Sequence, residues 1–373
     1  MTDLQSILPL WRELEAAGSD YVLATVVAVE GSSYRKPGAR MLLVQDGRRA
    51  GTVSGGCLEA EVARRAWWLT NSGPVVERYS TVEEDGDRPY GSGCGGIVHL
   101  LLERPQTARP VLESLEAEFK ARRPLAVATV LDGPQLGLRA MASEADSEPN
   151  APNELQRWAH WALERRTSFD RTILIDEAPT RLWVDYRPAR PGLWIFSAGD
   201  DAKPLVHLAQ ELGWFVAVAD GRSHLATRER FPTADDVRVL PIYDLPDSAP
   251  SHLSLRQTDA AVVMTHSFDQ DSHILASLLG LGFSLDYLGV LGPQRRTREM
   301  LAEAARLLRL PDPLARVDRW LAKMHAPTGL DLGADTPATI ALSIVAEIQK
   351  ALTSSTGEPL NQIRADREII TRC

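Results

Sequence analysis

The sequence has few cysteines, no excess of basic residues and no long apolar run. It contains three cysteines in 373 residues. Its opening segment, MTDLQSILPLWRELEAAG, lacks the basic region and apolar stretch of a secretion signal and instead predicts a short amphipathic helix. Few cysteines without such a signal predict a reducing, cytoplasmic setting, in which disulfides are not the first expectation.

Basic charge is also scarce. Lys and Arg number 41 against 50 Asp and Glu, which gives a formal net charge of −9 at pH 7. Because the phosphate backbone is bound by a basic face, this balance argues against nucleic acid as a general partner. The longest apolar stretch, Tyr21 to Val29, is too short to span a bilayer, so no membrane span is expected. The length predicts two or three domains, and a homodimer is possible.

Two of the three cysteines lie in the most glycine-rich turns of the chain. Cys57 stands in GTVSGGCLEAEV and Cys94 in PYGSGCGGIVHLLL. Glycine allows close backbone approach to a ligand, and successive N–H groups in such turns attract anions and favour thiolate over thiol. Each cysteine could instead be a small buried hydrophobe, but we favour a functional pair. Cys373 is terminal and is expected to be incidental.

These turns provide the first candidate site residues. Cys57 is expected at or just before a helix N-terminus, where the dipole lowers a thiol pKa. The catalytic candidates are Cys57, Cys94 and, as a proton carrier in the first turn of that helix, Glu59. A first-turn glutamate needs no such duty, however. Cofactor contact is expected from the neighbouring glycines Gly55, Gly56, Gly93 and Gly95.

Residues 1–188 are predicted to form an α+β domain. Strands are expected over YVLATVVAV, on both sides of the hairpin signal Asp46-Gly47, and over IVHLLLE, LAVATV, RTILI and RLWVDY. LEAEVARRAWWL predicts a helix. The polar, acidic and proline-bearing stretch at 143–160 is expected to be an exposed loop or linker.

From residue 189 strands and helices alternate, which predicts a C-terminal Rossmann-like domain with a parallel sheet over residues 189–352. Thr336-Pro337 is expected to cap its last helix. Residues 353–373 are predicted to be a polar tail.

The first strand–helix turn of this second domain, FSAGDDAKPL, resembles a degraded dinucleotide fingerprint. Ser197 takes the position of the first glycine, Gly199 the second and Ala202 the third. Asp220 ends the next strand, where a ribose-binding carboxylate would stand. Asp200 places negative charge beside the expected phosphate. The turn therefore predicts either a fold-only role or ligand binding, with NAD(P) as a weak cofactor candidate.

Further anion-binding candidates follow later strands and one early loop. In GVLGPQRRTREM a strand ends at Gly292 and a helix begins with Arg295 and Arg296, which suits an anionic group. In the first domain, GSSYRKPGAR combines hydroxyls and cations in a pattern suited to phosphate or pterin-like ligands; its candidates are Ser33, Arg35, Lys36 and Arg40.

His266 ends another strand and is expected to contact a ligand. A metal held by His266, Asp269 and His273 is an alternative, but no recognised ligand spacing supports it. The prediction is therefore no metal site built from protein side chains alone, although Cys57 and Cys94 could approach a metal carried by a cofactor.

Several segments in both domains resemble the xanthine dehydrogenase accessory (XdhC/CoxI) family. They are GSSYRKPGARMLLVQDGRRAGTVSGGCLEAEV, GSGCGG, SAGDDAKPLVHLAQELGW, VADGRSHLATRERFPTAD, YLGVLGPQRRTREML and HAPTGLDLGADTPATIALSIVAEI. The order of these motifs is the family's order. Members usually have glycine where Ser197 stands, and many have histidine where Asp200 stands.

The resemblance implies a maturation factor that binds the molybdenum cofactor (molybdopterin) transiently and assists its sulfuration and insertion. The implied partners are an apo molybdenum hydroxylase and a cysteine desulfurase as sulfur donor. Such a protein is a cofactor chaperone more than a turnover enzyme. Two other functions stay open at this point: an NAD(P)-dependent oxidoreductase, suggested by Gly199, Ala202 and Asp220, and a non-catalytic protein-binding scaffold.

Overall fold

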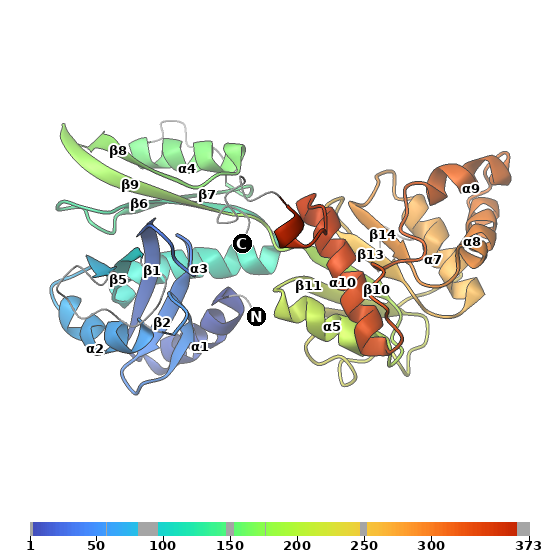
Figure 1. Ribbon diagram of the computed structural model, residues 1–373, viewed down its shortest axis with the longest axis horizontal. Helices are drawn as coiled ribbons and strands as arrows, with labels where there is room; N and C mark the ends of the chain where they lie inside the picture. The colour runs from blue at the N-terminus through green and yellow to red at the C-terminus, as the bar shows by residue number, and fades with distance from the viewer. Residues whose placement is uncertain are drawn as a thin grey trace. The chain divides into compact units, whose positions relative to one another are not determined.

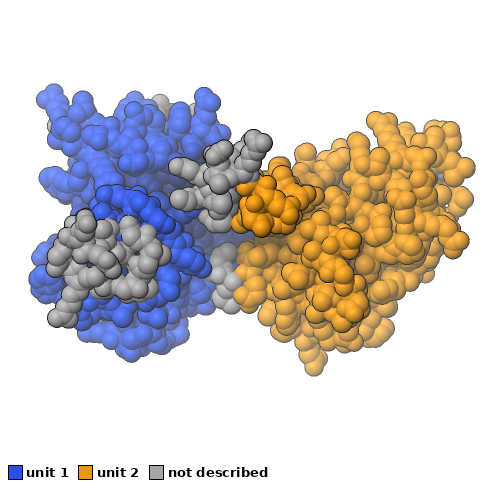
Figure 2. All heavy atoms as spheres, viewed as in Figure 1, with its two compact units in different colours: residues 1–190 blue, residues 191–373 orange. Residues whose placement is uncertain are grey.

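The computed structural model describes residues 3–56, 58–80, 96–146, 153–175, 177–246 and 252–363. The chain divides into two compact units, unit 1 (residues 1–190) and unit 2 (residues 191–373), which are coloured separately in Figure 2. The sequence places this division two residues earlier, between 188 and 189. No helix in the described part of the chain has the length and apolar character needed to cross a membrane.

The first half of unit 1 is an antiparallel sheet with the strand order β3-β2-β1-β5-β4. Its elements, in chain order, are α1 (Asp3–Ala17), β1 (Tyr21–Glu30), β2 (Arg40–Val44), β3 (Arg49–Gly51), α2 (Glu59–Leu69), β4 (Val75–Ser80) and β5 (Ile97–Glu103). The predicted hairpin is confirmed, because β2 pairs with β3 across a turn in which Gly47 has φ +92°. Helix α2 buries Val62 and Ala66 against this sheet.

The second half of unit 1 is an antiparallel sheet with the order β7-β6-β9-β8. Its elements are α3 (Pro105–Ala121), β6 (Leu125–Val130), β7 (Arg139–Ser143), α4 (Glu154–Arg165), β8 (Phe169–Ile175) and β9 (Ala178–Arg187). The expectation of a loop over all of 143–160 is wrong in its second half. Asn153 caps α4 with a capping box, and Ala159 is buried on the sheet.

Buried ion pairs join the two sheets of unit 1. Arg40, at the start of β2, donates to Asp185 of β9 at 2.9 Å, and both side chains are almost fully buried. Arg139 of β7 pairs with Glu103 of β5, whose side chain has no exposed surface. Because removing one partner of a buried pair leaves an uncompensated charge, these contacts fix how the sheets pack.

Unit 2 is a parallel five-stranded sheet flanked by helices on both faces (Figure 1). Its elements are β10 (Gly192–Phe196), α5 (Ala202–Glu211), β11 (Phe215–Asp220), β12 (Asp236–Val239), β13 (Ala260–Val263), α7 (Phe268–Leu279), β14 (Tyr287–Val290), α8 (Gln294–Leu307), α9 (Pro313–Leu321), α10 (Pro337–Thr353) and a 3₁₀ turn (Leu360–Gln362). The strand order β12-β11-β10-β13-β14 confirms the predicted Rossmann-like class.

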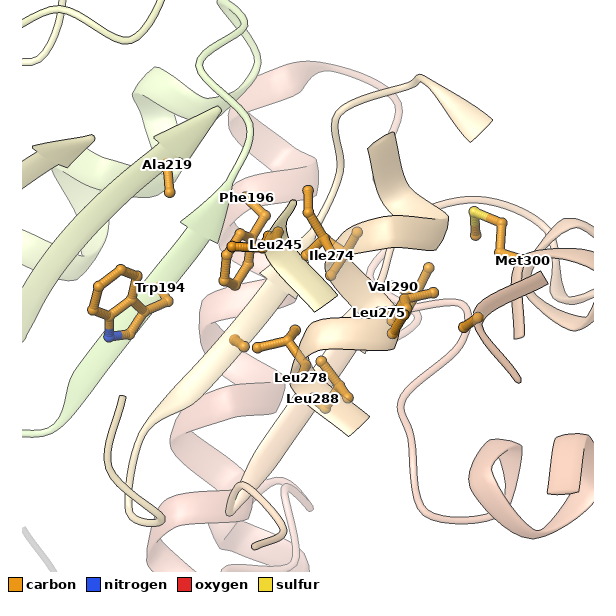
Figure 3. Packing of buried hydrophobic residues seen from close by; sticks show 14 of the residues in the cluster. Trp194, Phe196, Ala219, Leu245, Ile274, Leu275, Leu278, Leu288, Val290 and Met300 are labelled. Atoms are coloured by element: carbon orange, nitrogen blue, oxygen red, sulfur yellow. The ribbon is translucent and has the colours of Figure 1, made fainter. Parts of the chain in front are cut away.

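Alternation along the central strand β10 explains the two helical layers. Trp194 and Phe196 point to the face covered by α7 and α8, where they belong to the same apolar cluster as Leu275 and Met300 (Figure 3). The residues between them pack on the opposite face, with α5 and α10. Full burial on both faces is the reason this strand has a continuous apolar sequence.

The strand order also places a topological switch point between β10 and β13. The chain leaves these neighbouring strands toward opposite faces, so the loops that follow them, at Gly199 and His266, diverge at the carboxyl edge.

Candidate functional site

Unit 1 contains a cavity of 740 Å³ beside the first cysteine turn. Four chain segments meet there: the loop after β1, the end of β3, the turn into α2 and the start of β5. We call it the unit 1 cavity. It is lined by Ser32, Ser33, Tyr34, Arg49, Gly51, Thr52, Ser54, Gly55, Gly56, Leu58, Glu59, Gly96 and Val98.

Glu59 organises the turn that forms one wall of the cavity. Its carboxylate accepts a hydrogen bond from the Ser54 N–H at 2.9 Å, another from the Ser54 hydroxyl at 2.5 Å, and a third from the Thr52 hydroxyl. Ser54 Oγ in turn accepts from the N–H groups of Gly56, at 3.2 Å, and Leu58, at 3.1 Å. A carboxylate at the start of α2 thus holds the glycine turn in one shape.

This geometry favours a structural role for Glu59 over the predicted role as a proton carrier. Glu59 is only 2% exposed, and burial alone would oppose its charge. The hydrogen bonds from Ser54 and Thr52 overcome that cost and lower the pKa of Glu59 to about 2. A group that stays ionised near neutral pH and uses both oxygens on the turn is a structural anion.

Two glycines let the walls of the cavity approach each other. A Cβ on Gly96 would lie 1.9 Å from the carbonyl oxygen of Ser32, and a Cβ on Gly51 would lie 2.3 Å from that of Arg40. Gly51 and Gly56 also have positive φ values of +77° and +113°. Only glycine fits these positions, so the sequence builds the cavity from backbone contacts.

Arg49 and Tyr34 give the cavity its charge and its aromatic wall. Arg49 is exposed and is the one cation among the described lining residues. Its neighbour Arg48 is different, because it pairs with Glu13 at 2.6 Å and with Asp46 at 2.7 Å. Tyr34 is 74% exposed, and a Cβ added at Gly55 would lie 3.8 Å from its ring.

The predicted phosphate cluster in GSSYRKPGAR does not form as a cluster. Arg40 is buried on Asp185, and burial together with nearby Arg187 lowers its pKa to about 10. Arg35 pairs with Asp3 of α1. Lys36 is exposed but does not line the cavity, whereas Ser33 does. Arg40 and Arg35 thus use their charges in ion pairs of the fold, and neither is among the residues that line the cavity.

Four residues that line the cavity were not singled out by the sequence: Tyr34, Arg49, Thr52 and Ser54. The sequence did contain a signal for Thr52 and Ser54. Both carry a hydroxyl, they are two residues apart, and they precede a glutamate in the first turn of a helix. Arg49 lies in a hairpin strand, where the alternation of side chains predicts which face of the sheet Arg49 is on but not which residues surround it. Its place in a cavity depends on β5, which lies almost fifty residues further along the chain.

Cys57, Cys94, Gly93 and Gly95 lie outside the described residues. Two of the predicted glycines, Gly55 and Gly56, do line the cavity, and so does Leu58 on the other side of position 57.

In unit 2, the switch point is occupied by the protein's own side chains. His266, with φ +64°, places its ring Nε2 2.6 Å from Asp201 Oδ2. The Asp201 carboxylate also folds over Gly199, where an added Cβ would meet it at 2.5 Å. Asp200 pairs with Arg230 and Lys203, each at 2.8 Å. Both carboxylates of this turn are thus engaged by side chains of the protein itself.

Asp220 does not fit the predicted contact with a ribose. It is fully buried, and its carboxylate accepts hydrogen bonds from the Ala198 N–H at 2.7 Å and from the backbone and guanidinium of Arg222. Burial opposes its charge, but these hydrogen bonds lower its pKa. Asp220 thus ties the first strand–helix turn to the end of β11, and the structure gives no support to NAD(P).

The two arginines that follow β14, Arg295 and Arg296, also differ in their surroundings. Gly292 ends the turn with φ +106°. Arg295 is 91% exposed at its side chain, whereas Arg296 donates to the buried Asp271 at 2.7 Å. Arg296 therefore serves the fold, and of the two only Arg295 is exposed to an anion from solvent. Within the described ranges, no group of three or more His, Cys, Asp and Glu side chains is arranged to hold a metal ion.

Each of the two units is similar to known proteins. The model of the XdhC Rossmann domain matches residues 193–348, and that of the XdhC and CoxI family matches residues 14–80. A protein of Bacillus subtilis described as a probable subunit of xanthine dehydrogenase is 32% identical over 331 residues, which cover 88% of this chain and 92% of that protein. The molybdenum cofactor insertion chaperone PaoD of Escherichia coli is 33% identical over 132 residues, which are 33% of this chain and 38% of PaoD.

A solved structure agrees with these matches. The crystal structure of a xanthine dehydrogenase from Bacillus halodurans superposes with a TM-score of 0.70 at 29% sequence identity, and the alignment covers 98% of this chain and 100% of that one. With matching models in both units and a relative similar over nearly its whole length, this chain belongs to the XdhC and CoxI family.

Proposed function

We propose that this protein is a maturation factor that binds the molybdenum cofactor in the unit 1 cavity and delivers it to an apo molybdenum hydroxylase. One relative is named for xanthine dehydrogenase and another as a molybdenum cofactor insertion chaperone, and both names support this class of function. The observation that carries the proposal is the cavity itself, which joins an exposed cation, an aromatic ring and a glycine turn.

The lining residues suit the chemistry of this cargo. The cofactor is a pterin with a terminal phosphate and a dithiolene-bound metal. Arg49 would hold the phosphate, since it is the described cation of the cavity. Tyr34 offers an exposed ring for the flat pterin, and 740 Å³ is within the range of small-molecule sites.

The two thiols would add a sulfur function to this cavity. Cys57 is assigned to the cavity because its chain neighbours, Gly56 and Leu58, both line it. A soft thiolate there suits the cofactor metal or can carry sulfur as a persulfide. Cys94 is assigned with it as the second thiol, and a cysteine desulfurase is the proposed sulfur donor.

The direct test is anaerobic titration of the purified protein with isolated molybdenum cofactor. Bound molybdenum is measured by mass spectrometry and bound pterin by fluorescence of its oxidised form. We expect one cofactor per chain, with binding weakened about tenfold or more by Tyr34→Ala and by Cys57→Ala. Tyr243→Ala is the matched control, because Tyr243 is 75% exposed in unit 2 and lies outside the cavity. Failure of the wild-type chain to retain cofactor would end the proposal.

A further inference from the structure

A second hollow, of 250 Å³, lies in unit 2 at the amino edge of the parallel sheet. Its floor is apolar: Leu278 of α7 and Leu288 of β14 lie side by side there (Figure 3). Phe283, 37% exposed, and Trp320 of α9 form its walls. We call this hollow the α9 groove.

Basic side chains surround the apolar floor. Arg316, Arg319 and Lys323 all line the groove, and all three are exposed. Spacings of three and four residues along α9 and its C-terminal turn place them on one side of the helix. Across the described residues, none of the three has an ion-pair partner, whereas Arg298 of α8 pairs with Asp318 of the same helix α9.

The cations of the groove are opposite in sign to the charge of the whole protein. The formal net charge of the chain is −9, whereas the side chains that line the groove include three cations and no carboxylate. Lys and Arg rims without partners attract acidic surfaces and speed their approach. Apolar side chains of the partner would then fill the floor, as in other protein interfaces.

The size and place of the groove favour a protein segment over a small ligand. A volume of 250 Å³ is below the usual 300–1,000 Å³ of small-molecule sites but is large enough for one or two apolar side chains. The groove also lies where β14 begins, while Gly199, His266 and Gly292 follow the strands at the opposite, carboxyl edge. An occupant of the groove would leave that edge open.

We infer that the α9 groove docks an acidic segment of the apo molybdenum hydroxylase, with one or two apolar side chains in the floor and carboxylates on Arg316, Arg319 and Lys323. The identity of this partner rests on the proposed function. The docking surface itself is independent of cofactor binding, because every residue of the groove belongs to unit 2 and none lines the unit 1 cavity.

The test compares two charge reversals in the full chain. Arg316→Glu/Arg319→Glu reverses two of the three rim charges, and Arg306→Glu/Arg309→Glu makes the same change of charge at exposed positions outside the groove. Purified apo-hydroxylase is titrated by calorimetry at low and at high salt. We expect the rim variant to bind at least tenfold more weakly and the control to stay within threefold of wild type. Phe283→Ala should weaken the binding of apo-hydroxylase about fivefold without changing how that binding depends on salt.

Equal affinity of the rim variant and the wild type, or no binding of apo-hydroxylase by the wild type, would overturn the inference. Two parallel measurements identify a different occupant. If the rim variant loses only its binding to vesicles of phosphatidylglycerol and phosphatidylcholine, the groove serves a membrane surface; if it changes only self-association in sedimentation, the groove serves a second copy. Either result also overturns the inference.

Cofactor titration of the same variants keeps the two proposals apart. We expect the rim variant to bind the molybdenum cofactor as the wild type does, because its changes are confined to unit 2. Loss of apo-hydroxylase binding with normal cofactor binding supports the groove. A wild-type chain that binds apo-hydroxylase through the rim but never binds cofactor would refute the proposed function and leave the groove standing.

Discussion

At the scale of single residues, charged groups of this chain divide into those that hold the fold and those that face solvent. Glu59, Asp220 and Arg40 are buried, and each is surrounded by specific partners. Arg49 and Arg295 are exposed. The sequence identifies all five residues as charged but does not show which of them are buried. The reason is that their partners can be far away in the chain; that of Arg40 is Asp185, 145 residues away.

Glu59 gives a prediction with a defined pH dependence. Glu59→Gln should destabilise unit 1 by about 1–3 kcal/mol at pH 7, because charge-assisted hydrogen bonds to the turn are replaced by weaker ones. The folded-state pKa of about 2 lies below the unfolded value of about 4.3, so the carboxylate stabilises the fold above the unfolded value and loses this effect as the pH falls toward 2. Urea unfolding at a series of pH values measures this difference.

The control for that series is Glu113→Gln, on the exposed side of α3. It should leave the unfolding midpoint within experimental error of wild type. A Glu59→Gln difference that stayed constant from pH 7 to pH 2.5 would show that the carboxylate charge is not what holds the turn.

Asp220 separates a structural role from a nucleotide-binding role. Asp220→Asn should lower the stability of unit 2 by about 1–3 kcal/mol, since the half-buried Arg222 guanidinium and the Ala198 N–H lose their charged acceptor. Thermal unfolding by calorimetry measures the effect, and the exposed Arg295→Gln should show none. Normal stability together with altered dinucleotide affinity would instead restore Asp220 as a ribose contact.

At the scale of elements, strong local signals predicted the structure well. The Asp46-Gly47 hairpin and the Thr336-Pro337 helix cap are found where the sequence placed them, and Thr336 forms a capping box with Thr339. Two elements of unit 2 were not predicted. The edge strand β12 has the weak local signal DVRV and is fixed by pairing with β11. Helix α9 does have a local start signal, because Asp312 caps it and Pro313 follows.

The contact between β5 and the loop after β1 predicts a steric effect. Gly96→Ala should destabilise unit 1 by about 2–3 kcal/mol, because its Cβ would collide with the backbone oxygen of Ser32 and push the strand start away. Gly55→Ala, in the same cavity, meets only the Tyr34 ring at 3.8 Å and should cost less than about 1 kcal/mol. Chemical denaturation of both variants provides the comparison; equal costs would contradict the close approach described for Gly96.

At the scale of the whole molecule, the fold class and the family could be predicted from the sequence, because motifs in both units carry that information. The candidate site was predicted only in part. Backbone features of the turn, such as Gly55 and Gly56, were visible in the sequence, whereas Arg49, the cation that lines the cavity, was not among the predicted arginines. A cavity is made by segments that are distant in sequence, so its lining depends on packing that local patterns do not encode.

The chain as a whole should not bind nicotinamide dinucleotides. The carboxylates of Asp200 and Asp201 stand at the turn where a pyrophosphate would be held, and the Asp220 carboxylate is buried. Calorimetry with NAD⁺ and NADP⁺ at about 1 mM should detect no heat of binding, where a functional Rossmann site would be saturated. A measurable dissociation constant would require a different arrangement of this turn.

The central claim is that the unit 1 cavity holds the molybdenum cofactor, and adjacent arginines test it most directly. Arg49 lines the cavity, whereas Arg48 points to Glu13 and Asp46 outside it. Anaerobic binding of the cofactor should weaken about tenfold or more in Arg49→Ala and stay within twofold of wild type in Arg48→Ala, with both variants folded by circular dichroism. Equal cofactor binding by the two variants would contradict the claim.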